Sequence, residues 1–257
     1  MSHYAALATR SAEARAAAQL EALNGLLDEP LGALRDLASL PVFRKSELSE
    51  RQKAKPPFGG LVVRNASHVF QSPGPIYEPG GNSQDWWRFG RFLHALGVGS
   101  DDVVQNCFGY HLTPAGTMFE NAAHAVGAMV LPAGTGQTAL QVEAAAAVGA
   151  TVYAGTPDYL KVILEKADEM GVSLGIAKAG VSGGALFPAL RDYYTGRGII
   201  CRQCYATADL GHIAYESDAM EGMIVDEHVI VEIETPGTGD PVPAGDVGEV
   251  LVTALNP

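Results

Sequence analysis

Short apolar runs alternate with segments of helical periodicity between residues 86 and 211. Trp86, Phe89, Leu93 and Leu96 recur at the spacing of one helix face, and Gly97 ends that predicted helix. Strands are expected over 102–108, 128–131 and 151–154, over the apolar run before residue 182 and from residue 199, and helices over 113–127, 138–148, 156–171 and 186–194. This repetition predicts an α/β fold, in which helices flank a mostly parallel sheet.

The two ends of the chain show different patterns. Residues 4–27 predict a helix with Leu20, Leu23 and Leu27 on one face, and a shorter helix follows over 31–38. Beyond residue 211 the expected elements are short strands between tight turns, over 213–216, 222–225, 229–234 and 249–253. We therefore expect an N-terminal helical arm over 1–60, an α/β region over 61–211 and an incomplete β-rich subdomain over 212–257.

Composition excludes several classes of protein. Apolar residues make up 47% of the 257 residues, too many for a disordered chain and enough for a large buried core. The net charge of −12 argues against binding to the phosphates of nucleic acids. No apolar run approaches the roughly 18–20 residues that span a bilayer, and the N-terminus lacks the core of a signal peptide. We expect a cytoplasmic protein with neither nucleic acid nor membrane as a partner.

The three cysteines fit a reducing compartment better than a disulfide framework. Cys201 and Cys204 form a C-R-Q-C motif, which could indicate a redox pair or half of a metal site. They lie in a strand-like run, and neither a second cysteine pair nor a histidine cluster accompanies them. We interpret them as buried strand cysteines.

Two predicted strands end in residues that suit an adenosine phosphate. The first runs into Ser182, Gly183 and Gly184, and the second runs into Tyr205, Ala206, Thr207, Ala208 and Asp209. Ligands of parallel α/β sheets bind beyond the carboxyl ends of the strands. The first loop would offer bare backbone, the Tyr205 ring suits stacking on adenine, and the Asp209 carboxylate suits a magnesium ion.

The same stretch resembles the nucleotide-binding part of the adenylate-forming acyl-CoA ligases, most closely the phenylacetate-CoA ligase branch. Its motif there is Tyr-Gly-x-[Ser/Thr]-Glu: Tyr205 matches the tyrosine, Ala206 stands for the glycine, Ala208 for the hydroxyl residue and Asp209 for the glutamate. The strand G-D-V-G-E-V-L-V-T over 245–253 also matches a motif of these ligases at the expected distance.

The resemblance extends to the segments that would hold the acid. Residues 107–114, C-F-G-Y-H-L-T-P, resemble the family's acyl-pocket segment, which implies that Phe108, Tyr110 and His111 border the substrate. The glycine-rich loop over 132–138 matches a loop that shapes the same pocket, so Gly134 is included in the candidate site.

The loop after the strand 67–71 departs most from the family. Ser72 and Gly74 fit the frame of the family's phosphate-binding loop and are included among the nucleotide-binding candidates. Pro73 and Pro75, however, each remove a backbone donor, and Glu78 adds a negative charge where phosphates are expected. The loop is either an altered adenylation site or a stiff structural loop that happens to align.

The resemblance implies a reaction in two steps. A carboxylic acid, of an aryl and phenylacetate-like kind, reacts with ATP to form an acyl-adenylate, and the thiol of coenzyme A then displaces AMP. The implied ligands are ATP or AMP and Mg²⁺, with coenzyme A as co-substrate, and the acid is the small-molecule partner. Tyr205 would contact adenine, Asp209 would bind the metal ion, and no catalytic residue is assigned.

Relatives continue beyond the point that matches residue 257 into a ribose-binding carboxylate and a mobile domain with a catalytic lysine. We expect an N-terminal part that is inactive or nearly inactive in thioester formation, whether it arises from artificial truncation, from proteolysis or as a naturally short homologue. A strand edge left open at that point invites a second copy, so a homodimer is also considered, and a monomer in sedimentation would contradict it.

Two other functions remain as alternatives. The chain could be a non-catalytic module that binds a nucleotide or an acyl group, or a subunit that needs a partner carrying the missing domain. A Rossmann dehydrogenase is disfavoured, because no G-x-G-x-x-G motif opens a predicted helix with an acidic residue about 20 positions later.

Overall fold

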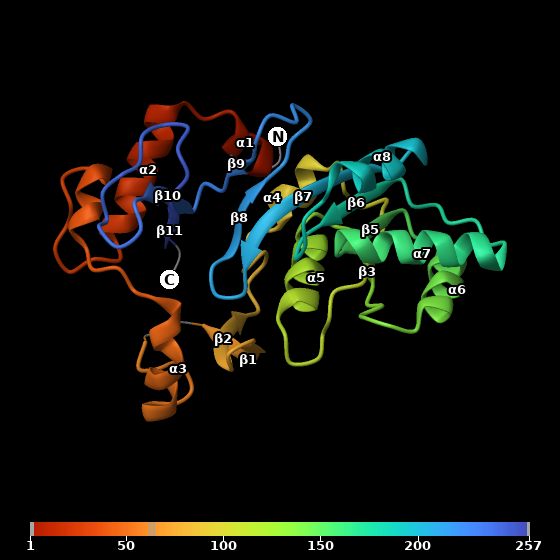
Figure 1. The fold of residues 1–257 in the computed structure, drawn as a ribbon, viewed down its shortest axis with the longest axis horizontal. Helices are drawn as coiled ribbons and strands as arrows, with labels where there is room; N and C mark the ends of the chain where they lie inside the picture. Colours follow the sequence, from red (N-terminus) through yellow and green to blue (C-terminus); the bar gives the residue numbers. More distant parts are fainter. Residues whose placement is uncertain (1–2, 62, 64, 256–257) are drawn as a thin grey trace. The chain divides into compact units, whose positions relative to one another are not determined.

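The computed structural model describes residues 3–61, 63 and 65–255 (Figure 1). The chain divides into two compact units, Ser49–Ile224 and Met1–Leu48 with Val225–Pro257. The predicted division into three parts at residues 60 and 211 stays a prediction, and the two units are described separately below.

The larger unit is built on a seven-stranded sheet in the order β4-β3-β5-β6-β7-β8-β9. Neighbouring strands from β4 to β7 are parallel, and β8 is antiparallel to β7. The strands are β3 (Val103–Asn106), β4 (Met129–Leu131), β5 (Val152–Gly155), β6 (Lys178–Val181), β7 (Ile200–Thr207), β8 (Gly211–Tyr215) and β9 (Ile224–Val225). The prediction of an α/β fold with a mostly parallel sheet is confirmed.

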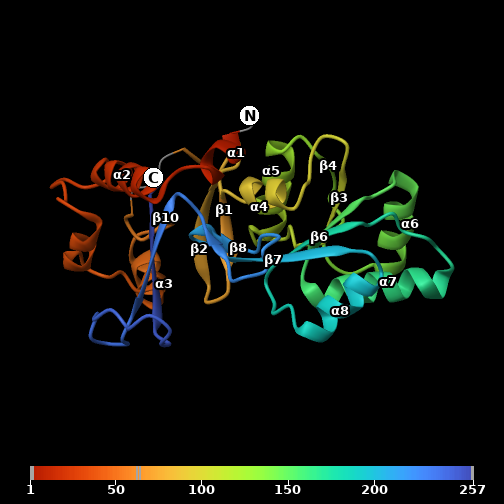
Figure 2. The ribbon, with the colours of Figure 1, turned by 90° about the horizontal axis from the view of Figure 1, so that it is seen from above.

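Helices cover both faces of this sheet. They are α4 (Gly90–Ala95), α5 (Ala115–Ala125), α6 (Thr138–Val148), α7 (Pro157–Met170) and α8 (Pro188–Gly196). The connection from β3 to β4 runs along the sheet in the opposite direction to the later ones. Because such crossovers are right-handed, α5 lies on one face and α6, α7 and α8 lie on the other (Figure 2). Among the described residues, no helix is long and apolar enough to cross a membrane.

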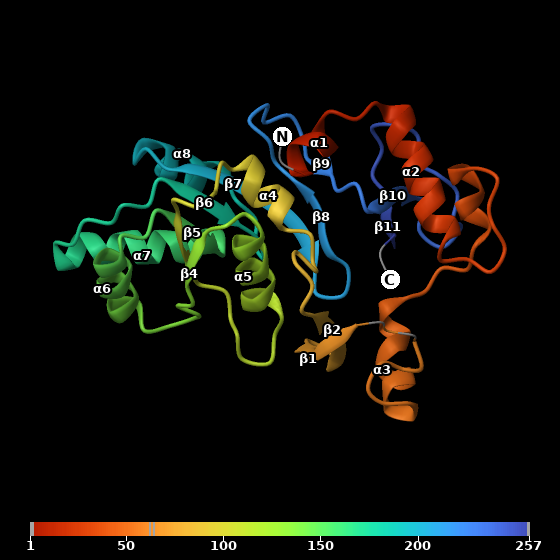
Figure 3. The same cartoon turned by 180° about the vertical axis from the view of Figure 1, so that it is seen from behind.

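The side chains of β5 show how the sheet separates two cores. Val152 and Ala154 are buried among residues of α4 and α5, including Phe92 and Phe119. Tyr153 points the other way and packs against Leu160 of α7 and other residues of that face. Figure 3 shows α4 and α5 together on their side of the sheet. A strand buried on both faces reads as a continuous apolar run, which is why the pattern predicted it.

The predicted helix boundaries hold where proline and glycine mark them. Helix α7 begins with Pro157 at its first position and ends at Gly171, whose φ of +66° suits a glycine. Other helix boundaries differ from the prediction, and α8, expected over 186–194, spans Pro188–Gly196. The helix expected from Trp86 begins only at Gly90, because Asp85 and Arg88 have positive φ angles of 55° and 66° that no α-helix contains. The helix expected over 113–127 is α5, which begins at Ala115 after Pro114 as its N-cap.

The smaller unit contains helices α1 (His3–Ala8) and α2 (Ala12–Asn24), the 3₁₀ helix η1 (Leu34–Ser39), and the antiparallel pair β10 (Val229–Glu234) and β11 (Glu249–Ala254). The single helix expected over 4–27 is interrupted, because the Ser11 hydroxyl accepts a hydrogen bond from the Ala14 N–H and caps a new helix. Leu23, Leu37 and Leu255 form the centre of its core.

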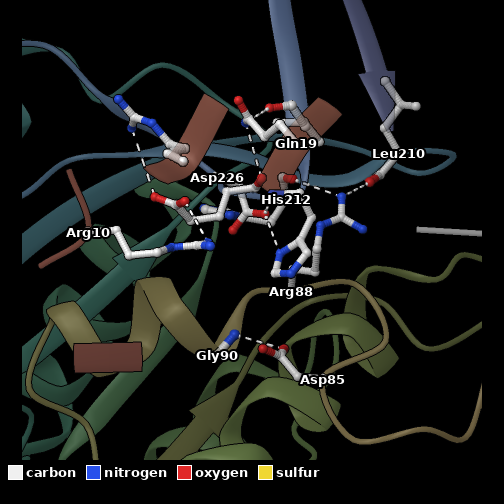
Figure 4. A network of polar contacts seen from close by, with 12 residues as sticks. Arg10, Gln19, Asp85, Arg88, Gly90, Leu210, His212 and Asp226 are labelled. Carbon is white, nitrogen blue, oxygen red and sulfur yellow. Dashed lines mark hydrogen bonds and ion pairs between the residues drawn. The ribbon is translucent and has the colours of Figure 1, made fainter. Parts of the chain in front are cut away.

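A buried carboxylate connects the N-terminal helices to the strand region of the smaller unit. Glu227 accepts a hydrogen bond from Arg10 at 2.9 Å. The Gln19 amide donates to the carbonyls of Glu227 and Val229, at 3.1 Å each (Figure 4). The N-terminal arm is therefore held by polar contacts as well as by its leucines.

Two elements were not predicted. Helix α3 (Lys45–Ala54) is polar along its length, so it gives no amphipathic signal. Strands β1 (Ala66–Ser72) and β2 (Ile76–Gly81) form an antiparallel hairpin, although only the first of them was expected.

The two cysteines of the C-R-Q-C motif lie on opposite faces of β7. Cys201 packs with the residues around Tyr153, whereas Cys204 packs with those around Phe92. Both thiols are free, and burial raises the pKa of each to about 12. The interpretation as buried strand cysteines is confirmed, since side chains on opposite faces of a sheet cannot pair.

Asp102 ties together the amino-terminal ends of three strands. One carboxylate oxygen accepts from the Thr151 hydroxyl at 2.8 Å, and the other from Lys178 Nζ at 2.8 Å and the Gly99 N–H at 3.0 Å. Its side chain is 12% exposed. Burial acts to raise the pKa of Asp102, but these donors outweigh it and hold the pKa below its usual value.

We expect this carboxylate to make stability depend on pH. Because the folded-state pKa is lower than the unfolded value of about 3.9, the stabilisation is present above that pH and is lost as pH falls through the folded-state pKa. Asp102→Asn should reduce the free energy of unfolding by about 1–3 kcal/mol near pH 7 and flatten its decline below about pH 5. Urea unfolding at several pH values measures both effects. Asp101→Asn, at an exposed neighbour, is the control, and parallel pH curves for wild type and Asp102→Asn would contradict the prediction.

Candidate functional site

Most of the predicted site residues lie at the carboxyl ends of the parallel strands of the larger unit, whereas Ser72 and Gly74 lie in the hairpin of β1 and β2. Adjacent strands β3 and β5 send their connections to opposite faces of the sheet, through α5 and α7. In open α/β sheets, ligands bind at the edge where such connections diverge. The segments after β3, β4, β6 and β7 all reach this edge, and each contains candidates named above.

The loop after β6 contacts two neighbouring segments of this edge. The Ser182 N–H donates to the Gly155 carbonyl at 3.2 Å, and its hydroxyl donates to the Cys204 carbonyl at 3.0 Å, next to Tyr205. A methyl group built at Gly183 would lie 3.8 Å from both the Phe108 ring and the Thr156 side chain. The structure therefore brings the predicted nucleotide loop beside the predicted acid-binding segment. Gly183 and Gly184 are exposed, as expected for bare backbone.

The second nucleotide-binding segment is a strand end rather than the expected loop. Strand β7 continues through Thr207 because β8 pairs with it, and a bulge separates Tyr205 from Ala206. The Tyr205 side chain is 46% exposed, whereas Ala206 packs against the core. Asp209 lies exposed in the turn between β7 and β8, which the Thr207 hydroxyl closes by accepting from the Leu210 N–H at 3.2 Å.

A buried arginine supports this turn through hydrogen bonds to its backbone. Arg88 donates from Nη2 to the carbonyls of Leu210 and of His212, the latter at 3.1 Å (Figure 4). The Trp87 carbonyl accepts from the His212 N–H at 2.9 Å, and any side chain at Gly211 would press against that carbonyl. Arg88 was not predicted as a supporting residue, because the apolar pattern placed it inside a helix. The only signal in the sequence was an arginine among aromatic residues, in the segment W-W-R-F-G-R-F over 86–92.

Tyr110 is held at the edge by two hydrogen bonds. Its hydroxyl accepts from Asn106 Nδ2 at 2.7 Å and donates to Glu120 Oε2 at 2.7 Å. Burial, with the Glu120 carboxylate as a further cause, raises the pKa of Tyr110 far above its usual value, so the ring stays neutral. Helix α5 can approach the ring because residue 116 is glycine, where a methyl group would lie 2.7 Å from it.

Phe108 and His111, the other candidates in the predicted acid-binding segment, differ from Tyr110 in their surroundings. Phe108 is buried and stacks on Phe119 with ring centroids 4.4 Å apart, so the core holds most of its ring. His111 is exposed in the bend after β3. That either residue borders a substrate stays a prediction.

The glycine-rich loop after β4 is anchored to the end of β3. The Gly134 N–H donates to the Asn106 carbonyl at 2.9 Å, and a methyl group at Gly109 would come within 3.9 Å of Thr135. Gln141 of α6 donates to three carbonyls of this loop. Neither Asn106 nor Gln141 was predicted to support the site, because the first lies in an expected strand and the second in an expected alanine-rich helix.

The segment over 72–79 is a tight hairpin rather than a loop. Ser72 pairs with Ile76 across the turn, and its hydroxyl donates to Glu78 at 2.8 Å. The Glu78 side chain is 1% exposed, so the charge expected among the phosphates is buried within the hairpin instead. Gly74, with φ of +139°, lies in the turn. The hairpin borders the acid-binding segment, because the Gln71 N–H donates to the Leu112 carbonyl at 2.8 Å.

The described residues include no group of three or more histidine, cysteine or acidic side chains placed to hold a metal ion. The sequence D-E-H over 226–228 forms a turn of the smaller unit, in which Asp226 accepts from the His228 N–H at 3.0 Å. Glu227 is engaged with Arg10.

Comparison with known sequences finds relatives over most of the chain, although no family model matches it. The phenylacetate-coenzyme A ligase of Thermus thermophilus is 28% identical over 253 residues, which cover 90% of this chain and 56% of the relative. Proteins of the same name from Aromatoleum evansii and Escherichia coli are each 26% identical, over 249 and 252 residues. The chain therefore spans 56% of the length of these relatives.

Solved structures of acyl-CoA ligases share the fold. A 2-hydroxyisobutyryl-CoA ligase in the postadenylation state, in complex with R3-HIB-AMP, superposes with a TM-score of 0.86 at 23% identity, over 96% of this chain and 60% of that one. The same ligase with 2-HIB-AMP and CoA gives 0.85 over 96% of this chain and 61% of that one. A long-chain-fatty-acid-CoA ligase from Archaeoglobus fulgidus gives 0.59 at 11% identity, over 78% of this chain and 45% of that one. The chain is therefore similar in sequence to phenylacetate-coenzyme A ligases, and it shares its fold with solved acyl-CoA ligases.

Proposed function

We propose that this chain provides the nucleotide- and acid-binding part of an acyl-CoA ligase. In the first step a carboxylate oxygen attacks the α-phosphorus of ATP, pyrophosphate leaves, and an acyl-adenylate forms. In the second step the sulfur of coenzyme A attacks the acyl carbon and loses its proton, and AMP leaves. The relatives' names support both steps, and the 2-hydroxyisobutyryl-CoA ligase structures hold acyl-adenylates and CoA.

The observation that carries this proposal is the meeting of three loops at one edge of the sheet. Ser182 bonds the carbonyl next to Tyr205, and Gly183 lies against Phe108. A single elongated ligand could therefore touch the glycine loop, the tyrosine and the segment after β3. An acyl-adenylate has this form, with an aromatic base at one end and an acyl group at the other.

Each end of such a ligand meets residues that suit it. The half-exposed Tyr205 ring would stack on adenine, with Ala206 and Thr207 beside it. The exposed backbone of Gly183 and Gly184 would approach the phosphate, as small residues allow. Tyr110 and Gly134 would border the acid, which we propose to be aryl and phenylacetate-like because the sequence relatives carry that name.

The Asp209 carboxylate fits a magnesium ion delivered with the nucleotide. Mg²⁺ is usually held by one or two carboxylates together with waters and substrate phosphates, so a dedicated cluster of side chains is not required. The ion, when bound, would neutralise phosphate charge and so reduce the repulsion between ATP and the substrate carboxylate. Arg88 would keep the Asp209 turn in place through the Leu210 and His212 carbonyls.

The hairpin over 72–79 favours a second candidate, a module that binds acyl-adenylates without forming them. Pro73 and Pro75 lack an N–H, and the Ser72 hydroxyl is engaged with Glu78. Few donors are then available there for the β- and γ-phosphates of ATP. A module of this kind would bind AMP-like ligands and leave adenylation to another chain.

Binding and exchange measurements separate the two candidates. We expect calorimetry to show the tightest binding for the phenylacetyl sulfamoyl-adenosine analogue of the acyl-adenylate, because it fills both ends of the site, and weaker binding for AMP. A ligase should also exchange labelled pyrophosphate into ATP when phenylacetate is present, whereas a module should bind the analogue without exchange. Absence of binding by AMP and by the analogue would contradict both candidates.

Removing the Asp209 charge tests the metal assignment. Asp209→Asn should abolish most of the tightening of ATP binding by Mg²⁺, a change of about tenfold in affinity, since an amide is a poorer ligand than a carboxylate. AMP binding without metal should stay unchanged. Calorimetric titration of ATP at zero and at saturating Mg²⁺ measures the difference, with Asp218→Asn, at a side chain 90% exposed, as the control. Equal magnesium effects in wild type and Asp209→Asn would rule out this role.

A further inference from the structure

One buried amide connects the loop after β4 to the core of the larger unit. Gln141, in the first turns of α6, is 4% exposed. Its Nε2 donates to the carbonyls of Gly136 at 2.7 Å, Gly134 at 3.0 Å and Ala133 at 3.4 Å. Two amide hydrogens thus serve three backbone acceptors within four consecutive residues.

The opposite end of the amide fixes its direction. Gln141 Oε1 accepts from Gln105 Nε2 at 3.2 Å and from the Cys107 thiol at 3.2 Å. Burial raises the pKa of Cys107 to about 12, so the thiol keeps the proton that it donates. If the amide were flipped, its NH₂ group would face the donor thiol of Cys107 and its oxygen would face the loop carbonyls. Neither arrangement forms hydrogen bonds, so the orientation of the amide is fixed.

The loop itself has little apolar packing to hold it. Gly134 and Gly136 have φ angles of 66° and 75°, and a methyl group built at either would meet no described atom within 4 Å. Glycines pay the largest entropy cost on ordering, so such a loop needs specific polar contacts to keep one conformation. The Gly134 N–H bond to Asn106 and the Tyr159 hydroxyl bond to Gly136 add to those from Gln141.

The held loop lies beside the acid-binding segment. Asn106, whose carbonyl accepts from Gly134, also donates its amide to the Tyr110 hydroxyl. Displacing the loop would therefore change the space next to Tyr110 while leaving Tyr205 and Asp209, on β7 and its turn, in place. The loop is connected to the acyl end of the proposed site and not to the adenine end.

We infer that Gln141 is a specificity-determining positioning residue, which sets the size of acid that the site accepts by holding the loop over 133–136. This inference rests on the proposed function. Gln141 contacts no ligand in this role and acts through the carbonyls that it binds. Loss of its contacts should make the site tolerant of acids of different size while the affinity for AMP is kept.

The test compares sulfamoyl-adenosine analogues that carry a phenylacetyl or an acetyl group, with AMP as the reference. For each protein, calorimetry gives the ratio of the two analogue affinities. Gln141→Met, which keeps length and helix propensity but not the hydrogen bonds, should reduce this ratio about tenfold. Glu143→Met, at an exposed position of the same helix, is the matched control and should leave the ratio unchanged. Hydrogen exchange at residues 133–136 should increase in Gln141→Met alone.

A second variant covers the case in which Gln141→Met does not fold. Gly136→Val places a β-branched residue at a φ of 75° on the exposed loop, so it should shift the loop without disturbing the core and should also reduce the ratio. An unchanged ratio in the folded variants, or an equal loss of affinity for both analogues and AMP, overturns the inference alone. Failure of the wild-type chain to bind any adenosine ligand overturns the proposed function, and the inference with it.

Discussion

The site depends on one topological constraint, the divergence of two adjacent parallel strands. β3 and β5 pair in register, Val104 with Val152, yet the chain leaves them toward opposite faces of the sheet. Right-handed crossovers allow no other arrangement once β4 lies on one side of β3 and β5 on the other. The helices that follow these two strands, α5 and α7, therefore lie on opposite faces and leave that edge uncovered. The loops after β3, β6 and β7 can contact one another there. As a direct result, a methyl group built at Gly183 would lie 3.8 Å from both Phe108 and Thr156.

Packing against the hydrophobic core cannot by itself hold loops of this kind in one conformation. They consist largely of glycine and small residues, which give close approach to a ligand but provide few apolar contacts. In this chain, polar side chains that are themselves buried hold them by bonding backbone carbonyls. Ser182, Gln141 and Arg88 all act in this way, each on a different loop. Because an unpaired buried polar group is costly, each such side chain favours one loop conformation strongly.

This contrast between a core of regular elements and loops held by buried polar side chains explains which features the sequence could predict. Strands such as β5 and helices such as α7 follow from local patterns, since burial on two faces and a Thr-Pro start leave direct traces in the sequence. The candidate residues after β6 and β7 were also found from local features. The supporting residues were not, because Arg88 acts on Leu210, more than a hundred positions away, and nothing local marks that contact. Polar α3 and the hairpin strand β2 were missed for a related reason, since neither has a simple apolar period.

The hairpin over 72–79 bears differently on the two ends of the proposed site. Its prolines lack an N–H donor, and its Ser72 hydroxyl donates to the buried Glu78 side chain. The hairpin therefore offers few donors that could bind a triphosphate. Its backbone nevertheless supports the proposed acid-binding side, because the Gln71 N–H donates to the Leu112 carbonyl in the segment that follows Tyr110. Nucleotide contacts proposed for Tyr205 and Gly183 lie on other strands and do not depend on the hairpin. The physical consequence is that affinity for an acyl-adenylate and affinity for ATP can separate in this fold, since the acyl-adenylate has lost the phosphates that the hairpin would otherwise have to bind.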